Sequence, residues 1–127
     1  MSNTIVYSPD APEPIGPYSQ AVLKNGTLYV SGQIAINKST GNLVSGSIEE
    51  ETEQVMKNLK AVLAAANLTF SNVVKCSIFV KDLNNFTKIN DIYGKYFEIN
   101  PPARETVEVS RLPKDVNVEI SCIAVLE

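Results

Sequence analysis

The sequence predicts an α+β fold in which two helices cover one face of a mixed, largely antiparallel sheet. Three observations support this class. Apolar and polar residues alternate in several short segments, apolar residues recur at helical spacing in two longer ones, and the segments follow the order β-β-β-α-β-α-β-β. The chain has 127 residues, of which 44% are hydrophobic, and this is the usual size of one domain. We therefore expect a single domain over residues 1–127.

The first third of the chain predicts three strands, at residues 4–7, 19–23 and 28–33. Asn25-Gly26 separates the second strand from the third, and this dipeptide is a strong signal for a tight hairpin turn. We therefore expect those two strands to pair antiparallel.

The first helix is the most clearly marked element. Ser47-Ile48-Glu49-Glu50 has the pattern of a capping box, in which the serine and the glutamate each satisfy a free backbone amide. Beyond it, five apolar residues recur at helical spacing: Val55, Leu59, Val62, Leu63 and Ala66. This pattern predicts a helix that begins after Ser47 and ends near Asn67.

A strand and a second helix follow. The strand is predicted at residues 74–81, where Val74, Cys76, Ile78 and Val80 alternate with the remaining side chains.

The second helix is predicted over residues 86–97, with Pro101-Pro102 stopping the chain from continuing it. Its apolar stripe consists of Phe86, Ile89, Tyr93 and Phe97. Asn90 lies on the same side, where its amide either bonds local backbone or water, or faces a ligand.

The last part of the chain predicts two strands, residues 104–110 and 116–125, joined by a turn at residues 111–114. We expect them to form an antiparallel hairpin. Keeping the apolar side chains together pairs Val107 with Val118 and fixes the register.

That register places Thr106 across from Glu119, with Arg104 diagonal to it, so Arg104 and Glu119 are expected to share one face. Such a pair can be a surface ion pair that contributes about 0 to 1 kcal/mol. Three features favour a carboxylate-binding site instead. Arg104 follows a Pro-Pro-Ala break, Glu119 has apolar neighbours, and the turn at residues 16–20 holds Tyr18 on rigid backbone.

The face that carries Glu119 also carries Ile123 and Val125. Apolar side chains on a sheet face that no helix covers indicate contact with another chain. We therefore expect an oligomer.

Composition excludes several classes of function. The formal net charge is −3 and the basic residues are scattered, which argues against a nucleic-acid partner. The sequence shows no basic leader and no long apolar run, so we expect a cytoplasmic protein without a membrane partner. The chain has no histidine, which removes histidine-dependent triads and the commonest zinc sites.

Cys76 and Cys122 stand in apolar, β-branched stretches and are expected to be core thiols.

Six short motifs, in matching order and spacing, resemble the RidA (YjgF-like) family of reactive intermediate deaminases. They are Ile15-Gly16-Pro17-Tyr18-Ser19-Gln20-Ala21, Tyr29-Val30-Ser31-Gly32-Gln33-Ile34, Asn72-Val73-Val74-Lys75, Pro102-Ala103-Arg104, Leu112-Pro113-Lys114 and Val118-Glu119-Ile120. The resemblance covers nearly the whole chain.

The resemblance implies a chorismate-mutase-like α+β fold assembled as a homotrimer, with an active site in each cleft between neighbouring subunits and no cofactor or metal. It implies hydrolysis of 2-iminobutanoate and 2-iminopropanoate to 2-keto acids and ammonia. Arg104 would bind the substrate carboxylate through its planar fork, and Glu119 would handle the water and its protons. Tyr18 and Asn90 would line the cleft, and Ser31-Gly32 would supply its wall.

Two positions differ from the best-known bacterial members of that family. Thr106 stands where they carry cysteine, so a thiol has no role here, and the resemblance assigns this position mainly a backbone carbonyl that helps to hold the water. Glu105, beside the motif arginine, is a further difference without a predicted effect. Two other functions stay open: a non-catalytic module that binds small carboxylates in the same cleft, and an RNA-directed activity, which the acidic charge weakens.

Overall fold

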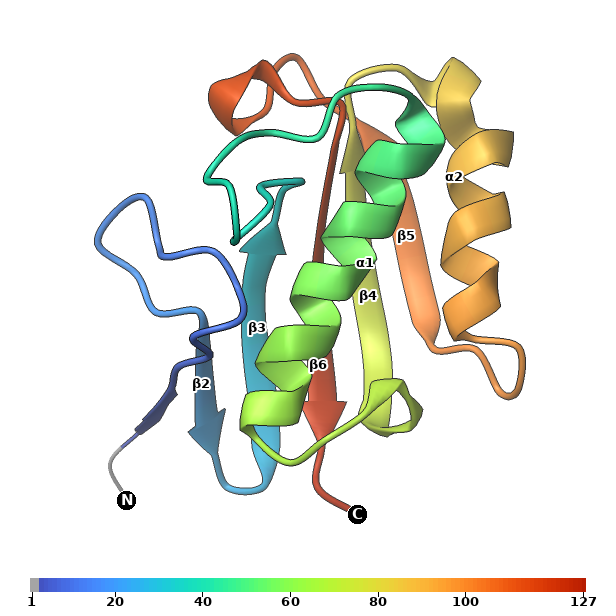
Figure 1. Cartoon of the computed structure of the whole chain (residues 1–127). Helices are drawn as coiled ribbons and strands as arrows, with labels where there is room; N and C mark the ends of the chain where they lie inside the picture. The colour runs from blue at the N-terminus through green and yellow to red at the C-terminus, as the bar shows by residue number, and fades with distance from the viewer. Residues whose placement is uncertain (1–2) are drawn as a thin grey trace.

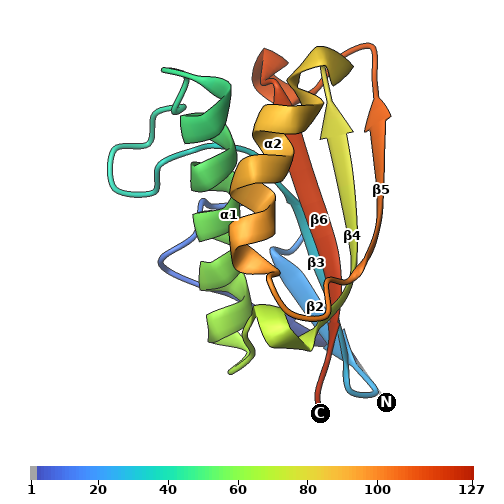
Figure 2. The ribbon, with the colours of Figure 1, turned by 90° about the vertical axis from the view of Figure 1, so that its right-hand side faces the viewer.

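The structure, a computed structural model, describes residues 3–127; residues 1 and 2 of the predicted domain lie outside the described part. Figure 1 shows a single sheet with the strand order β1-β2-β3-β6-β4-β5. The main elements are β1 (Thr4–Val6), β2 (Ala21–Lys24), β3 (Thr27–Gln33), α1 (Ile48–Ala65), β4 (Val73–Val80), α2 (Phe86–Tyr93), β5 (Ala103–Glu108) and β6 (Val118–Val125). Both helices pack on the same face of the sheet (Figure 2), which confirms the predicted fold class.

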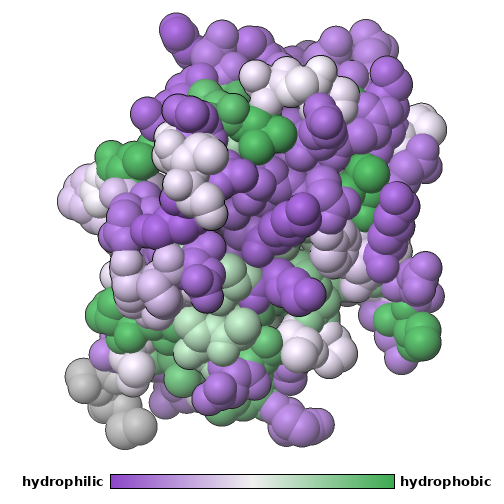
Figure 3. All heavy atoms as spheres, viewed as in Figure 1, coloured by the Kyte–Doolittle hydropathy of each residue, from purple (hydrophilic) through white to green (hydrophobic). Residues whose placement is uncertain are grey.

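The first helix forms as predicted. The side chain of Ser47 accepts a hydrogen bond from the backbone amide of Glu50 at 3.1 Å, and this caps the helix start. Four apolar side chains of α1 are fully buried against the sheet: Val55, Leu59, Val62 and Leu63. Viewed from the helix side, the outer surface of the protein is mainly hydrophilic (Figure 3), as amphipathic helices require.

The second helix is shorter than predicted. α2 ends at Tyr93, and the chain continues as a short 3₁₀ turn, Gly94–Tyr96. Glycine is a poor helix former, and the amide of Gly94 bonds the carbonyls of both Asn90 and Ile92, so the last turn tightens. Phe97 is nevertheless buried as expected.

The predicted hairpin between the last two strands is wrong. β5 pairs with β4 in parallel, and β6 pairs antiparallel with β3 and β4, so β4 lies between β5 and β6. The connection over residues 109–117 is too long for a tight turn and crosses the end of β4, where Lys81 forms an ion pair with Asp115 at 2.8 Å. The β4-α2-β5 order instead forms a crossover unit, whose two strands run parallel.

This topology also overturns the prediction that Arg104 and Glu119 share a face. Residues paired across strands point to the same side of a sheet. Glu119 pairs with Phe79, on the face that no helix covers, whereas Arg104 pairs with Cys76, on the face under the helices. Thr106 lies across from Ile78 and not from Glu119.

The uncovered face of the sheet, which we call the open face, carries Glu119 together with apolar side chains. Tyr29 pairs there with Ile123 and is 52% exposed, and Val107 is 39% exposed. Both cysteines lie on the opposite face, buried as free thiols, which confirms that they belong to the core. Among the helices of residues 3–127, none is long and apolar enough to cross a membrane.

Candidate active site

A pocket of about 290 Å³ opens beside Glu119. Its walls come from the loop before β2, the end of β3, the turn before β6 and β6 itself. The lining residues are Ile15, Tyr18, Ser31, Gly32, Ile34, Pro113 and Glu119. Four of the predicted site residues therefore meet here: Tyr18, Ser31, Gly32 and Glu119.

The carboxyl group of Glu119 is half-buried on the pocket wall. No hydrogen bond or ion pair reaches it from residues 3–127. Burial without a compensating partner disfavours the charged form and raises the pKa of Glu119. A carboxylate with a raised pKa and unoccupied oxygens is a stronger base than an exposed one, and it can return the proton that it accepts.

Gly32 gives Glu119 the space for this position. A Cβ at residue 32 would stand 2.8 Å from Cδ of Glu119 and closer still to Oε2. The glutamate side chain therefore lies flat against the backbone of β3, where any other residue would displace it. Near this point the pairing of β3 with β6 shifts register, between Val30 and Gln33.

The side chain of Tyr18 folds back over the turn that contains it. Its hydroxyl oxygen accepts a hydrogen bond from the amide of Ile15 at 3.2 Å, and its ring packs over Gly16. Because the oxygen acts as an acceptor in that bond, the hydroxyl hydrogen is available for a ligand. Tyr18, which lines the pocket, thus has a hydroxyl donor that is not used within its own turn.

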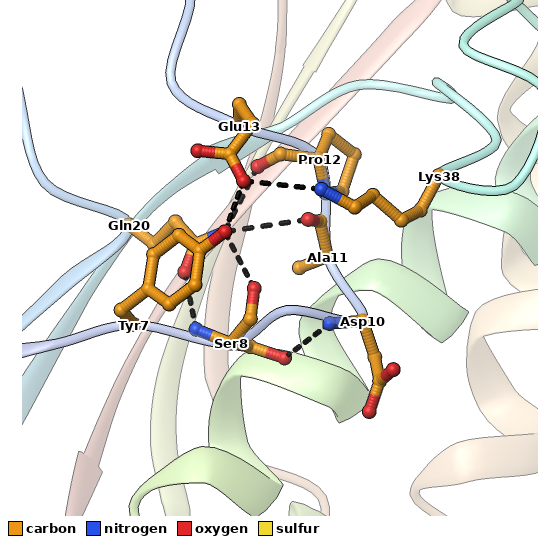
Figure 4. Close-up of polar contacts among 8 residues, drawn as sticks. All are labelled: Tyr7, Ser8, Asp10, Ala11, Pro12, Glu13, Gln20 and Lys38. Atoms are coloured by element: carbon orange, nitrogen blue, oxygen red, sulfur yellow. Dashed lines mark hydrogen bonds and ion pairs between the residues drawn. The ribbon is translucent and has the colours of Figure 1, made fainter.

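A buried glutamine holds the loop that carries Tyr18 (Figure 4). Oε1 of Gln20 accepts from the amide of Ser8 at 2.6 Å, and Nε2 donates to the carbonyls of Pro12, Ser8 and Ala11 at 2.9, 3.2 and 3.4 Å. Outside this amide, Glu13 accepts from the Tyr7 hydroxyl and pairs with Lys38. The loop is therefore held by the Gln20 amide in the interior and by the contacts of Glu13 at the surface.

Ser31 joins this loop to β3. Its hydroxyl donates to the carbonyl of Ser19 at 2.6 Å, and its amide donates to the carbonyl of Gln20 at 2.9 Å. Because the hydroxyl hydrogen is already used, Ser31 can offer a ligand only acceptor capacity. Its observed contribution is to fix the wall.

Arg104 stands apart from this pocket, at the edge strand β5 under α2. Its Cζ lies 5.0 Å from the ring centroid of Tyr93 and 5.6 Å from that of Phe86. No carboxylate from residues 3–127 pairs with it. Asn90 lies between the two aromatic residues on the same side of α2, since residues three and four apart are neighbours on a helix.

The Thr106 hydroxyl does not face solvent. Its oxygen is buried and has no hydrogen-bond partner among the described residues. The role expected for Thr106, a backbone carbonyl that helps to hold the water, does not depend on this side chain.

Glu105 belongs to a separate group on the open face. It accepts a hydrogen bond from the Ser77 hydroxyl and pairs with Lys75 at 3.0 Å. These contacts lower the pKa of Glu105. Its side chain therefore points away from the face that carries Arg104.

The predicted site residues thus form two separate half-sites in one chain. One contains Glu119 with Tyr18, Ser31 and Gly32, and the other contains Arg104 with Asn90. Arg104 lies two strands away from Glu119, at ~4.8 Å per strand, and about three residues further along the strand direction, at ~3.3 Å per residue. It also lies on the opposite face of the sheet. One small molecule cannot contact both within a single chain.

Sequence reasoning missed several neighbours of these residues. The helical spacing predicts that Phe86 and Tyr93 share a face with Asn90, but it does not indicate that both rings contact Arg104. Ile34 and Pro113 were recognised only as motif positions, and nothing in their pattern indicated a pocket wall. Within residues 3–127, no group of three or more histidine, cysteine, aspartate or glutamate residues is arranged to hold a metal.

Comparison with known proteins identifies relatives of this chain. The family model described as Endoribonuclease L-PSP matches residues 8–126. The human 2-iminobutanoate/2-iminopropanoate deaminase is 46% identical over 121 residues, which cover 95% of this chain and 88% of the human protein.

Two solved structures are similar over almost their full length. A protein of unknown function of the conserved Rid family, YyfA from Yersinia pestis, has a TM-score of 0.96 and 50% identity, covering 98% of this chain and all of that one. TdcF of E. coli with bound serine has a TM-score of 0.93 and 36% identity, covering 98% of this chain and 99% of that one.

Proposed function

The chain belongs to the RidA (YjgF-like) family, and from this premise we propose that it hydrolyses 2-iminobutanoate and 2-iminopropanoate to 2-keto acids and ammonia. The observation that carries the proposal is the half-buried carboxyl group of Glu119, which has a raised pKa, no partner within residues 3–127, and a pocket of about 290 Å³ beside it. The human relative that carries the deaminase name supports this activity.

Arg104 binds the substrate carboxylate. A guanidinium donates two parallel hydrogen bonds to a carboxylate, which fixes the orientation of the bound molecule as well as its charge. The lack of a carboxylate partner within residues 3–127 supports this role, because the N–H donors are not already occupied. E. coli TdcF, whose structure contains bound serine, supports a small amino-acid-like ligand.

Glu119 moves the protons of the reaction. Its carboxylate takes a proton from water as the oxygen attacks the imine carbon, and it returns that proton to the nitrogen, which leaves a hydroxyl and an amine on a tetrahedral carbon. The carboxylate then takes the hydroxyl proton and passes it to the amine, the C–N bond breaks, and ammonia leaves as the C=O bond of the keto acid forms. The raised pKa of Glu119 suits this role, because burial makes its carboxylate a stronger base toward the attacking water.

The remaining predicted residues orient the substrate and water. The free hydroxyl hydrogen of Tyr18 and the amide of Asn90 supply hydrogen bonds to polar atoms of the ligand. Ser31 and Gly32 supply the wall, and the backbone carbonyl of Thr106 helps to hold the water. No step needs a cofactor or a metal, since the attacking water and the departing ammonia require only proton transfer.

We also propose that the working unit is a homotrimer. The two half-sites lie on opposite faces of one sheet, so a substrate can contact both Arg104 and Glu119 only where two copies meet. The exposed apolar side chains of the open face, among them Tyr29 and Val107, support a contact between copies there. A cyclic arrangement then repeats the same composite site at each contact.

A coupled assay tests the activity. A serine or threonine dehydratase generates the imine, and keto-acid release is followed with and without this protein. We expect acceleration that Arg104→Ala removes and Arg111→Ala, an exposed arginine outside both half-sites, retains. No acceleration with either precursor would reject the deaminase proposal. Binding of 2-ketobutanoate by calorimetry without any turnover would then favour a non-catalytic carboxylate-binding module.

A further inference from the structure

Two aromatic rings of α2 hold the guanidinium of Arg104. The Cζ atom lies 5.0 Å from the Tyr93 centroid and 5.6 Å from the Phe86 centroid. Both distances fall within the ~6 Å at which a cation is attracted to the face of an aromatic ring. Phe86 and Tyr93 are seven residues apart, two turns along one helix face, so a single rigid helix supplies both contacts.

The two rings differ in what else they do. Tyr93 is 5% exposed and packs against Phe97 at a centroid distance of 4.8 Å, so it also belongs to the core. Phe86 is 41% exposed, which is unusual for a ring whose only purpose is burial. The contact with Arg104 therefore gives Phe86 a reason for its place on α2.

This arrangement suits an arginine whose N–H donors must remain free to bind an anion. A carboxylate partner would occupy the N–H donors at the edge of the guanidinium and cancel its charge. A ring face attracts the same cation and leaves the N–H donors at its edge free. It also restricts a long side chain with many rotamers, so less freedom is lost when a ligand binds.

We propose that Phe86 and Tyr93 are positioning residues, which hold the Arg104 guanidinium in the orientation that receives a carboxylate. This inference rests on the proposed role of Arg104 in binding the substrate carboxylate. The rings act through Arg104: they fix where its donors point, and the affinity for small 2-keto and 2-imino acids depends on them.

The first test is calorimetry with 2-ketobutanoate, the product of the proposed reaction, on the full chain. We expect Tyr93→Leu to weaken binding about tenfold and Phe86→Leu severalfold, because each removes one ring from the guanidinium. Tyr93→Phe keeps the ring and removes only a hydroxyl that has no partner among the described residues, so it should recover the affinity that Tyr93→Leu loses.

Phe97→Leu is the matched control. Phe97 is buried at the end of the same helical segment and packs against Tyr93, but no contact between its ring and Arg104 is present in the described residues. It should lower thermal stability as Tyr93→Leu does while leaving the affinity close to wild type. Equal weakening by the two substitutions would mean that general loosening explains the effect, and would overturn the proposal.

A second measurement does not depend on ligand binding. Protons of the Arg104 side chain should show upfield ring-current shifts by NMR, which Tyr93→Leu reduces and Phe97→Leu preserves. Unchanged Arg104 signals in Tyr93→Leu would overturn the positioning role. If the wild-type protein bound no 2-ketobutanoate, the proposed role of Arg104 would fail, and the NMR result would still decide whether the rings hold the guanidinium.

Discussion

The carboxylate of Glu119 lies against the backbone of Gly32, so closely that a Cβ at residue 32 would stand 2.8 Å from Cδ of the glutamate. Gly32→Ala should therefore push the carboxylate out of its position. We expect kcat/KM to fall on the order of 10²-fold, since a misplacement of ~1 Å has about that effect. Steady-state kinetics would measure it.

Gly94→Ala is the matched control for this substitution. Gly94 has helical backbone angles, and a Cβ there would meet nothing within 4 Å. It should keep full activity and unfold at the same or a slightly higher temperature. Equal kinetics for the two alanine variants would contradict the account of Gly32.

Glu119→Gln should lower the activity of the protein and raise its stability. Loss of the proton-transfer group should lower kcat by about 10² to 10⁴-fold. The wild-type rate should rise with pH as Glu119 ionises, because the attacking water needs a base. Burial raises the pKa of Glu119, so the folded state disfavours the carboxylate.

The stability effect of this substitution has a definite sign. The penalty on the ionised carboxylate is absent below the unfolded pKa of ~4.3 and is fully present above the raised folded pKa. Glu119→Gln should thus melt at a higher temperature than wild type at neutral pH, and the difference should shrink as the pH falls through that window. Calorimetry at several pH values would measure it, and a less stable Gln variant at neutral pH would argue against an uncompensated carboxylate.

Thr106→Val should stabilise the protein. The Thr106 hydroxyl oxygen is buried without a partner among residues 3–127, and a methyl group of similar shape removes that unsatisfied group. We expect the free energy of unfolding to rise by about 1 kcal/mol. Thr69→Val should do the opposite, because the Thr69 hydroxyl accepts from the amide of Ser71. Urea unfolding of both variants would measure these changes in the free energy of unfolding. A destabilised Thr106→Val would show that the hydroxyl has a partner in solution.

Gln20→Leu should loosen the loop that carries Tyr18. It leaves the amide of Ser8 and three carbonyls without their partner, which should cost about 2 to 3 kcal/mol or more. Limited proteolysis should then cut within residues 8–20, and KM should rise as Tyr18 moves. Gln54→Leu, at a glutamine on α1 that bonds only Asn58 among the described residues, should leave the loop resistant. If the loop of Gln20→Leu remained uncut, the proposed role of Gln20 in holding the loop would be wrong.

Much of the fold follows from local patterns in the sequence. The capping box at Ser47 and the apolar spacing of α1 predict its start and buried face because both signals act within a few residues. The last hairpin could not be predicted in the same way. Pairing of β5 with β4 depends on a crossover through α2, which brings together segments far apart in the chain.

The sequence suggests candidate site residues, but it does not predict how the fold arranges them. Tyr18, Ser31, Gly32 and Glu119 meet as expected, because β3 and β6 are neighbours. Arg104 does not join them, since the inserted strand β4 moves it two strands away and the register turns it to the opposite face. Local alternation predicts which side chains share a face of one strand, and it carries no information on which strand lies beside it.

The most direct test of the composite site mixes two inactive variants. Arg104→Ala and Glu119→Gln are unfolded together in equal amounts and refolded, so that their copies exchange. If each site takes Arg104 from one copy and Glu119 from its neighbour, the mixture should recover about one quarter of the wild-type deaminase rate. If the mixed oligomers form and no activity returns, the two residues do not act across a contact between copies, and the central claim is wrong.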